Sequence, residues 1–263
     1  MSPLKNLILT IVFISITIKS ASQNVDFCGT VNYTQIVNFD FEYLENYLLT
    51  FSGSESLYEE VEIKTSNTTK KTLNSDLGTT NAIIGGRKNT TAKFYYNNKV
   101  SFYFKDNFSD EVLFVKENSF SWNWNLHNET KKIGKFISNK ATIKFRGREY
   151  IAWYTNDIPL PYGPWKFQGL PGLILEVYDI DEVFHIVPNK ITLDNKNKCE
   201  ISLNKEAFKN TLNIKNYLKR KEEIIENIFA EMSSRLPKGS KPLKLNKNCK
   251  DCKQEIERFN EDN

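Results

Sequence analysis

One stretch of the chain joins a constrained turn to an apolar strand, and it limits the fold more than any other feature. It reads GPWKFQGLPGLILEVYD, from Gly163 to Asp179. Pro171-Gly172 is typical of a type II turn, because proline presets φ at the first central position and glycine accepts a positive φ at the second. The segment from Leu173 to Tyr178 is apolar apart from Glu176, which predicts a strand with at least one buried face.

The residues just before this turn have two interpretations. In the structural one, Trp165 and Phe167 cover the turn as part of the core. In the functional one, a rigid loop presents Trp165, Lys166 and Gln168 to a ligand. The two interpretations differ in whether Trp165 is buried.

A family resemblance rests on the same stretch. The motif resembles the signature of the GLPGLI family of secreted proteins of Gram-negative bacteria, and it consists of Gly169, Leu170, Pro171, Gly172, Leu173 and Ile174. Further similar segments occur, in the family's usual order, at 129–134, 140–142, 145–148, 152–155, 158–159 and 163–167. The chain departs from many members at Ser138, where they have a cysteine.

The resemblance implies a fold and a compartment rather than an activity. Members have a signal peptide and a β-rich body, and relatives resemble a bowl or half-barrel. The family is largely uncharacterised, and its relatives include an N-terminal accessory domain of a secreted bacterial amidase that cleaves glycans.

The first 22 residues are typical of a secretory signal. Lys5 supplies a positive charge, residues 7–18 are apolar, and Ser20, Ala21 and Ser22 are small residues that suit cleavage before Gln23. The apolar run is short for a membrane-spanning helix, and no second long apolar run follows. We therefore expect an exported protein that is periplasmic, associated with the outer membrane or secreted, with no transmembrane segment in the mature chain.

Four cysteines follow the signal segment, and an even number in an oxidising compartment is compatible with two disulfides. Their pairing stays open among Cys28, Cys199, Cys249 and Cys252. Cys249 and Cys252 have the spacing of a redox motif, but their surroundings do not resemble a thioredoxin unit, which favours a structural role. The sequence shows no second CxxC and no HxxxH for a zinc site, so we expect no metal and no cofactor.

The remaining pattern predicts a mainly β fold of the α+β class. Strands are expected at 27–37, 45–63, 112–115, 119–126, 173–178, 182–188 and 191–193, with hairpins at 93–105 and 140–155, the latter turning at Gly147. Residues 64–92 are expected to be irregular. Short and long helices are expected at 203–212 and 215–236, the second ending at Pro237. The predicted architecture is a curved antiparallel sheet, a bowl or half-barrel, with the C-terminal helices packed on it.

This pattern divides the chain into three parts. They are a signal peptide at 1–22, a single β-rich domain at 23–237 that includes the C-terminal helix, and a polar, loosely held tail at 238–263 that contains two cysteines.

The usual catalytic motifs are missing from the sequence. It has two histidines, His127 and His185, and no GxSxG or other recognisable nucleophile motif, so we interpret both histidines as structural. A phosphate loop and a dinucleotide fingerprint are also missing. The formal charge is +4, and removal of Lys5 and Lys19 with the signal segment would leave +2, which does not indicate a nucleic-acid binder. No catalytic residue is predicted, although the fold could still bring two carboxylates together.

One group of side chains is suggestive, because guanidinium groups hold carboxylate or phosphate while tryptophan and tyrosine stack on sugars or apolar rings. The candidate ligand-binding residues are Arg146, Arg148, Trp153, Tyr154, Trp165 and Lys166. The competing interpretation places the cations on the solvated face of a strand and the aromatic residues in the core.

Three function classes remain open. The favoured one is an exported, non-enzymatic protein that binds an unknown ligand or a cell-envelope protein within a concave sheet. The alternatives are a secreted hydrolase acting on glycan or peptide, or an accessory module of one, and a scaffold for an outer-membrane assembly.

Overall fold

The computed structural model describes residues 28–39, 42–61, 70–75, 78–83, 93–98, 100–118, 120–194, 199, 201–237, 239–241, 256–257 and 259. The strands, in chain order, are β1 (Cys28–Asn38), β2 (Glu42–Phe51), β3 (Ser56–Glu60), β4 (Lys70–Ser75), β5 (Gly78–Ile83), β6 (Phe94–Asn97), β7 (Phe102–Phe108), β8 (Glu111–Glu117), β9 (Asn125–Ile133), β10 (Phe136–Phe145), β11 (Arg148–Thr155), β12 (Leu173–Asp179), β13 (Phe184–Asp194) and β14 (Leu212–Asn213). The helical elements are a 3₁₀ helix, η1 (Lys205–Asn210), and an α-helix, α2 (Ile214–Ser234).

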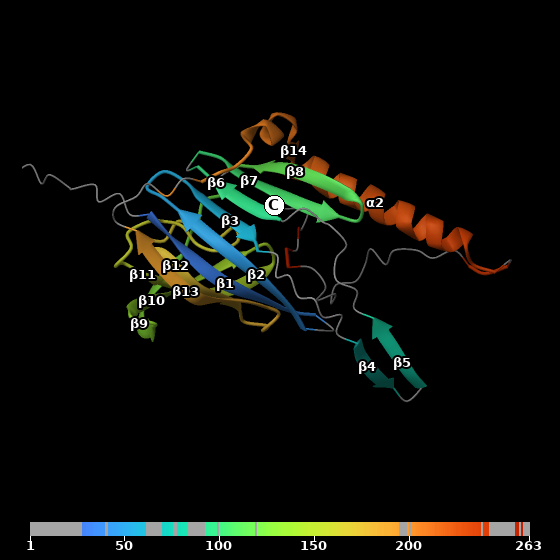
Figure 1. Cartoon of the computed structure of the whole chain (residues 1–263), viewed down its shortest axis with the longest axis horizontal. Helices are drawn as coiled ribbons and strands as arrows, with labels where there is room; N and C mark the ends of the chain where they lie inside the picture. Colours follow the sequence, from blue (N-terminus) through green and yellow to red (C-terminus); the bar gives the residue numbers. More distant parts are fainter. Residues whose placement is uncertain are drawn as a thin grey trace, which may run out of the picture.

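Twelve of these strands form one sheet, shown in Figure 1. Their order is β14-β8-β7-β6-β3-β2-β1-β13-β12-β11-β10-β9, and β4 pairs separately with β5. All neighbours in the large sheet are antiparallel except β14 and β8, which are parallel. The predicted mainly β fold with an antiparallel sheet and a C-terminal helix is confirmed.

The sheet is open and strongly curved. Glu117, at the end of β8, forms a 2.8 Å ion pair with Arg146, which follows β10, although eight strands lie between β8 and β10 in the sheet. A contact between strands so far apart in the order requires a curved sheet, and we call the side on which Glu117 and Arg146 meet the concave face. Tyr33 of β1 also donates a hydrogen bond, across β13, to the carbonyl of Ile174 in β12 at 2.7 Å.

The core fills this concave face with large apolar side chains. Fully buried tyrosine and phenylalanine residues come from β1, β2, β3, β11, β13 and the loop before β12, and include Tyr33, Tyr47, Tyr58, Tyr150, Tyr162, Phe51, Phe167 and Phe184. Since each such ring buries a large apolar area, aromatic packing dominates the stability of this body.

The hairpin predicted at 140–155 is the most regular part of the sheet. β10 pairs with β11 from Asn139↔Tyr154 to Phe145↔Arg148, which leaves a two-residue connection. Both connecting residues have positive φ, 49° at Arg146 and 73° at Gly147. A type I′ turn requires this, because its twist matches that of the flanking strands.

Several sequence-based expectations differ from the structure. Residues 120–124 were expected to form a strand, but they pair with no neighbour, and the ladder begins at Asn125. The region expected to be irregular at 64–92 contains β4 and β5. The short helix expected at 203–212 is the 3₁₀ helix η1.

The expected type II turn at Pro171-Gly172 is wrong. Gly172 does not have a positive φ. The position requires glycine for another reason, because a Cβ there would lie 2.1 Å from the carbonyl oxygen of Thr155. The glycine lets the start of β12 approach the end of β11 through the backbone.

Helix α2 covers the β7–β8 end of the sheet. It begins at Asn213, whose side chain accepts a hydrogen bond from the backbone N–H of Asn216 at 2.8 Å, an N-cap that satisfies one free helical donor. Its Tyr217 and Ile224 are buried against β7 and β8. In the part of the chain that the structure describes, no helix has both the length and the apolar character needed to cross a membrane.

A disulfide joins Cys28 at the start of β1 to Cys199, 171 residues later, with a Cα–Cα distance of 5.6 Å. This bond confirms the predicted structural role for two of the four cysteines, Cys28 and Cys199. Cys249 and Cys252 lie outside the described residues, as does the predicted signal segment.

The tail was expected to be loose, and its described residues fall into two groups. Residues 239–241 are exposed. Ile256 packs against the main core, and Glu257 and Phe259 contact buried cations. No local pattern indicates this packing, because the partners of the segment lie about a hundred residues earlier in the chain.

Candidate functional site

The loop from Asn156 to Gly172 crosses the concave face between β11 and β12. Four prolines, Pro159, Pro161, Pro164 and Pro171, exclude regular structure there, and backbone hydrogen bonds hold the loop instead. The N–H of Gly169 donates to the Pro161 carbonyl at 2.9 Å, and the N–H of Ile174 donates to the Tyr162 carbonyl at 2.9 Å. The loop is therefore a fixed wall of the interior.

Trp165 belongs to the core. Its side chain is 5% exposed and packs against the rings of Tyr95, Phe145, Phe167 and Phe184 at centroid distances from 5.2 to 6.4 Å. Its φ of 54° is unusual for a bulky residue and is maintained by this packing. The position of Trp165 supports the structural interpretation, in which its side chain is part of the core.

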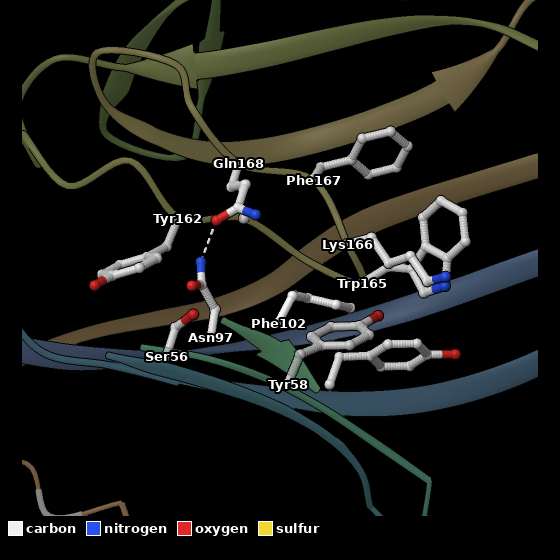
Figure 2. A pocket seen from close by; sticks show the side chains of 11 residues that line it. Ser56, Tyr58, Asn97, Phe102, Tyr162, Trp165, Lys166, Phe167 and Gln168 are labelled. Carbon is white, nitrogen blue, oxygen red and sulfur yellow. Dashed lines mark hydrogen bonds between the residues drawn. The ribbon is translucent and has the colours of Figure 1, made fainter. Parts of the chain in front are cut away.

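A small polar cavity lies under the loop (Figure 2). It has a volume of about 10 Å³, roughly the space of one water molecule. Asn97 donates a hydrogen bond across it to the side-chain oxygen of Gln168. The hydroxyl groups of Tyr58 and Tyr162 are buried nearby and have no hydrogen-bond partner in the described part of the chain. Burial, with a smaller contribution from Glu55, raises the pKa of Tyr162 to about 12, so this hydroxyl keeps its proton at neutral pH.

Beside this cavity, a groove of about 240 Å³ opens to solvent. We call it the aromatic groove. The residues that line it are Asn97, Val100, Ser101, Phe102, Phe120, Trp122, Pro161, Tyr162, Gln168 and Gly169. The groove thus combines aromatic rings with two side-chain amides, which suits a ligand that has both apolar faces and hydrogen-bonding groups.

Two local features build the wall of this groove. Gly169 has a φ of 87°, and a Cβ there would lie 2.9 Å from the Cβ of Trp122, so glycine lets the loop press against the indole. The indole N–H of Trp124 donates to the Gln168 carbonyl at 2.8 Å, and its ring stacks on Trp122 with centroids 6.0 Å apart. The indole N–H of Trp122 itself is buried, and no described residue accepts its hydrogen bond.

A buried ionic cluster lies behind the loop. Lys166 Nζ is 2.9 Å from a carboxylate oxygen of Glu117 and 2.8 Å from both carboxylate oxygens of Glu257. Arg146 pairs with the other oxygen of Glu117 at 2.8 Å, and its Nε lies 3.8 Å from Glu257. Two of the sequence-predicted cations are thus brought together, but inside the protein rather than on the solvated face of a strand.

Arg148, the third predicted cation, is also buried. Its NH1 group pairs with Asp179 at 2.8 Å, and the other oxygen of Asp179 accepts the backbone N–H groups of Val183 and Phe184 at 2.8 and 2.7 Å. Removing either charge would leave the other buried and uncompensated, so this pair fixes the turn between β12 and β13.

The remaining candidates lie apart from these groups. Tyr154 is buried in the main core. Trp153, its neighbour on β11, lies on the opposite face of the sheet, where Lys131 Nζ is 4.6 Å from the ring centroid. The candidate set therefore does not form one surface, and whether its members bind a ligand stays a prediction.

Both histidines have side-chain partners on strands. His127 contacts the Thr142 hydroxyl at 2.9 Å, and His185 contacts Glu176 at 3.0 Å. Burial raises the pKa of Glu176, but hydrogen bonds from His185 and Lys131 outweigh this effect, so the net pKa lies below its ordinary value. Within the described residues, no group of three or more His, Cys, Asp or Glu side chains is placed to hold a metal ion.

Sequence reasoning did not include the aromatic groove in the candidate site. It did predict a strand at 119–126, which contains Phe120, Trp122 and Trp124. It also singled out Gln168 in the loop. The missing signal was the contact between these two segments, which lie more than forty residues apart in the sequence.

Residues 145–176 match a family model described as a protein of unknown function, Porph_ging. The matched segment runs from the β10–β11 turn through the loop into β12, and it contains the motif Gly169–Ile174. The description of the model does not carry the GLPGLI name. The match covers the loop and its two flanking strand ends, and no other part of the chain.

The other comparisons add distant likenesses. No curated protein matches the chain. Two solved structures of PNGF-II are similar, one in space group P21 with 15% identity and a TM-score of 0.44, covering 72% of this chain and 31% of that one. The other, in space group C2, has 15% identity and a TM-score of 0.42, covering 70% and 30%. The chain spans less than a third of the length of PNGF-II.

Proposed function

We propose that this chain is an exported, non-enzymatic binding protein of the periplasm or cell surface, and that it holds its ligand in the aromatic groove. The observation that carries the proposal is the meeting of aromatic rings and amide side chains in an open groove of about 240 Å³. The groups beneath it, the Trp122 indole N–H and the Tyr162 hydroxyl, have no hydrogen-bond partner among the described residues.

The lining favours a saccharide ligand. Aromatic rings such as Phe120 and Trp122 can pack against the apolar face of a sugar ring, while the amides of Asn97 and Gln168 can donate to and accept from its hydroxyls. Among the described residues, the lining contains no Lys, Arg, Asp or Glu side chain, which favours an uncharged ligand over a phosphate or carboxylate.

The same lining supports binding rather than hydrolysis. Among the lining residues that the structure describes, none carries a carboxyl, imidazole or thiol group that could act as a general acid or base. Ser101 lines the groove and has a hydroxyl group, but neither histidine lines the groove beside it to act as its base. His127 and His185 contact Thr142 and Glu176, which lie on strands outside the groove lining. The hydrolase alternative gains no support from this arrangement.

The proposal includes export and the division of the chain. Residues 1–22 would be removed, and residues 23–237 would form a single domain followed by the segment 238–263. The Cys28–Cys199 bond supports an oxidising compartment, since disulfides persist there and are rare in the cytosol. N-terminal sequencing of the exported protein should begin at Gln23.

Calorimetric titration with neutral oligosaccharides, such as maltohexaose, cellohexaose and chitohexaose, tests the proposed ligand class. Gln168→Met removes the amide at the groove and should weaken binding of the recognised sugar about tenfold, the value of one good hydrogen bond. Asn123→Ala is the matched control, because this exposed amide lies outside the groove lining. An absence of saturable binding to every sugar, or equal weakening by both variants, would contradict the proposal.

A further inference from the structure

The buried cluster of Arg146, Lys166 and Glu117 requires one more negative charge. The two cations and one carboxylate leave a net positive charge in a site where all three side chains are at most 6% exposed. Glu257 supplies the missing charge through its contacts with Lys166. An uncompensated buried charge is strongly destabilising, so this position selects for a carboxylate.

Ile256 and Phe259, which lie before and after Glu257 in the chain, also contact cations. Arg148 Nε donates to the backbone carbonyl of Ile256 at 3.1 Å, which would fix the direction of a peptide chain. The guanidinium of Arg146 lies 4.3 Å from the ring centroid of Phe259 and 4.8 Å from that of Phe120, so it is stacked between two aromatic rings. Figure 1 shows the described part of this C-terminal segment in red.

The segment adds little to the packing of the main core. The buried residues of that core all lie between Val31 and Ile186, and Ile256 joins them as a partly buried neighbour. Among the described residues, the N–H at Arg146 Nε is buried without a hydrogen-bond partner, so Glu257 leaves one donor of the cluster unused. The cations therefore belong to the body of the protein, and the segment supplies the carboxylate that pairs with them.

We propose that Arg146, Arg148 and Lys166 form a peptide-recognition site for a segment in which a glutamate lies between an apolar and an aromatic residue. The chain's own residues 256–259, Ile-Glu-Arg-Phe, are its resident occupant and compete with such a segment of a partner protein. This site adjoins the aromatic groove at Phe120, whose ring lies by the Arg146 guanidinium, but it takes an acidic peptide rather than a neutral sugar. The two proposals are tested with different ligands and can fail independently.

Fluorescence anisotropy with a labelled peptide of residues 254–263, QEIERFNEDN, tests the site on the full chain. The variant Glu257→Ala weakens the resident segment and leaves the three cations in place. We expect this variant to bind the peptide at least tenfold more tightly than the wild-type chain does, because its own segment competes less. Glu231→Ala is the control, since it removes an exposed carboxylate of α2, and it should behave as the wild type does.

A second peptide, in which glutamine replaces Glu257, tests specificity for the carboxylate. This peptide should bind at least tenfold more weakly than the first. If Glu257→Ala does not fold, Phe259→Ala replaces it, because this change leaves the ionic cluster intact and still weakens the segment. Absence of saturable binding to a folded variant, or equal affinity for both peptides, would show that the segment is an integral part of the core and would overturn the proposal.

Discussion

Replacing Gly172 tests the reasoning about the loop most sharply. A Cβ at this position would lie 2.1 Å from the carbonyl oxygen of Thr155, 2.7 Å from its carbonyl carbon and 3.1 Å from the backbone nitrogen of Asn156. All three atoms are backbone, and Thr155 is paired with Leu173 in the sheet. Gly172→Ala must therefore push β12 away from β11 by more than an ångström.

The expected cost follows from this geometry. Overpacking that forces backbone shifts costs typically about 1–3 kcal/mol, and we expect the upper end, about 3 kcal/mol, because no flexible side chain can move aside. For a body of this size that corresponds to a fall in Tm of about 6–12 °C. Urea denaturation followed by tryptophan fluorescence measures the change in unfolding free energy directly.

Gly134 provides the matched control. It has a φ of 58° and open space around it, so Gly134→Ala should cost about 1 kcal/mol for the left-handed backbone alone, and Gly134→Asn less. At Gly172 the order of the two destabilisations should differ. Gly172→Asn should destabilise the protein at least as much as Gly172→Ala, because any Cβ clashes with the backbone of Thr155. The steric explanation would be refuted if Gly172→Ala were as stable as the wild type, or if Gly172→Asn were much less destabilising than Gly172→Ala. The second result would indicate a turn with positive φ at Gly172.

Three further predictions concern stability. Trp165→Ala should cost about 3–5 kcal/mol in a denaturation experiment, because four rings pack against this side chain, whereas an unchanged stability would place it on a ligand surface. Reduction of the Cys28–Cys199 bond should cost up to about 2–5 kcal/mol, and an identical melting curve with and without reductant would argue against a stabilising bond. Glu176 has a lowered pKa in the folded state, so its stabilising contribution is present above the ordinary value of 4.5 and is lost as the pH falls through the lowered pKa. The stability difference between the wild type and Glu176→Gln should therefore shrink between pH 7 and pH 3, and a difference independent of pH would contradict the hydrogen-bonded carboxylate.

Much of the fold could be predicted because its signals are local. Residues 140–155 alternate in a period of two, and Gly147 marks the turn, so the hairpin was predicted with its turn in the right place. The C-terminal helix was predicted to within two residues at each end, from its apolar stripe and Pro237. These features depend on neighbours within a few residues.

The errors arise where distant segments meet. The alternation in Phe120, Trp122 and Trp124 is typical of a strand, but the rings pack against the loop instead of a ladder neighbour. Glycine at position 172 looked like a turn residue, because the sequence does not show that Thr155 lies against it.

The candidate site was predicted only in part for the same reason. The cations were recognised as a group suited to carboxylates, but their partner Glu257 lies about ninety residues beyond Lys166. The aromatic groove was missed because its two walls belong to segments that the sequence keeps apart, and no local pattern links Trp122 to Gly169.

The indole N–H signals of a ¹⁵N-labelled protein test the central claim most directly. The four tryptophans report on different places, with Trp122 in the groove wall, Trp124 stacked on it, Trp165 in the core and Trp153 on the opposite face. On titration with the oligosaccharide that binds most tightly, the account predicts saturable shifts of the Trp122 and Trp124 signals and a static Trp153 signal. A shift confined to Trp153, or no shift with any sugar, would contradict the claim that the aromatic groove is the binding site.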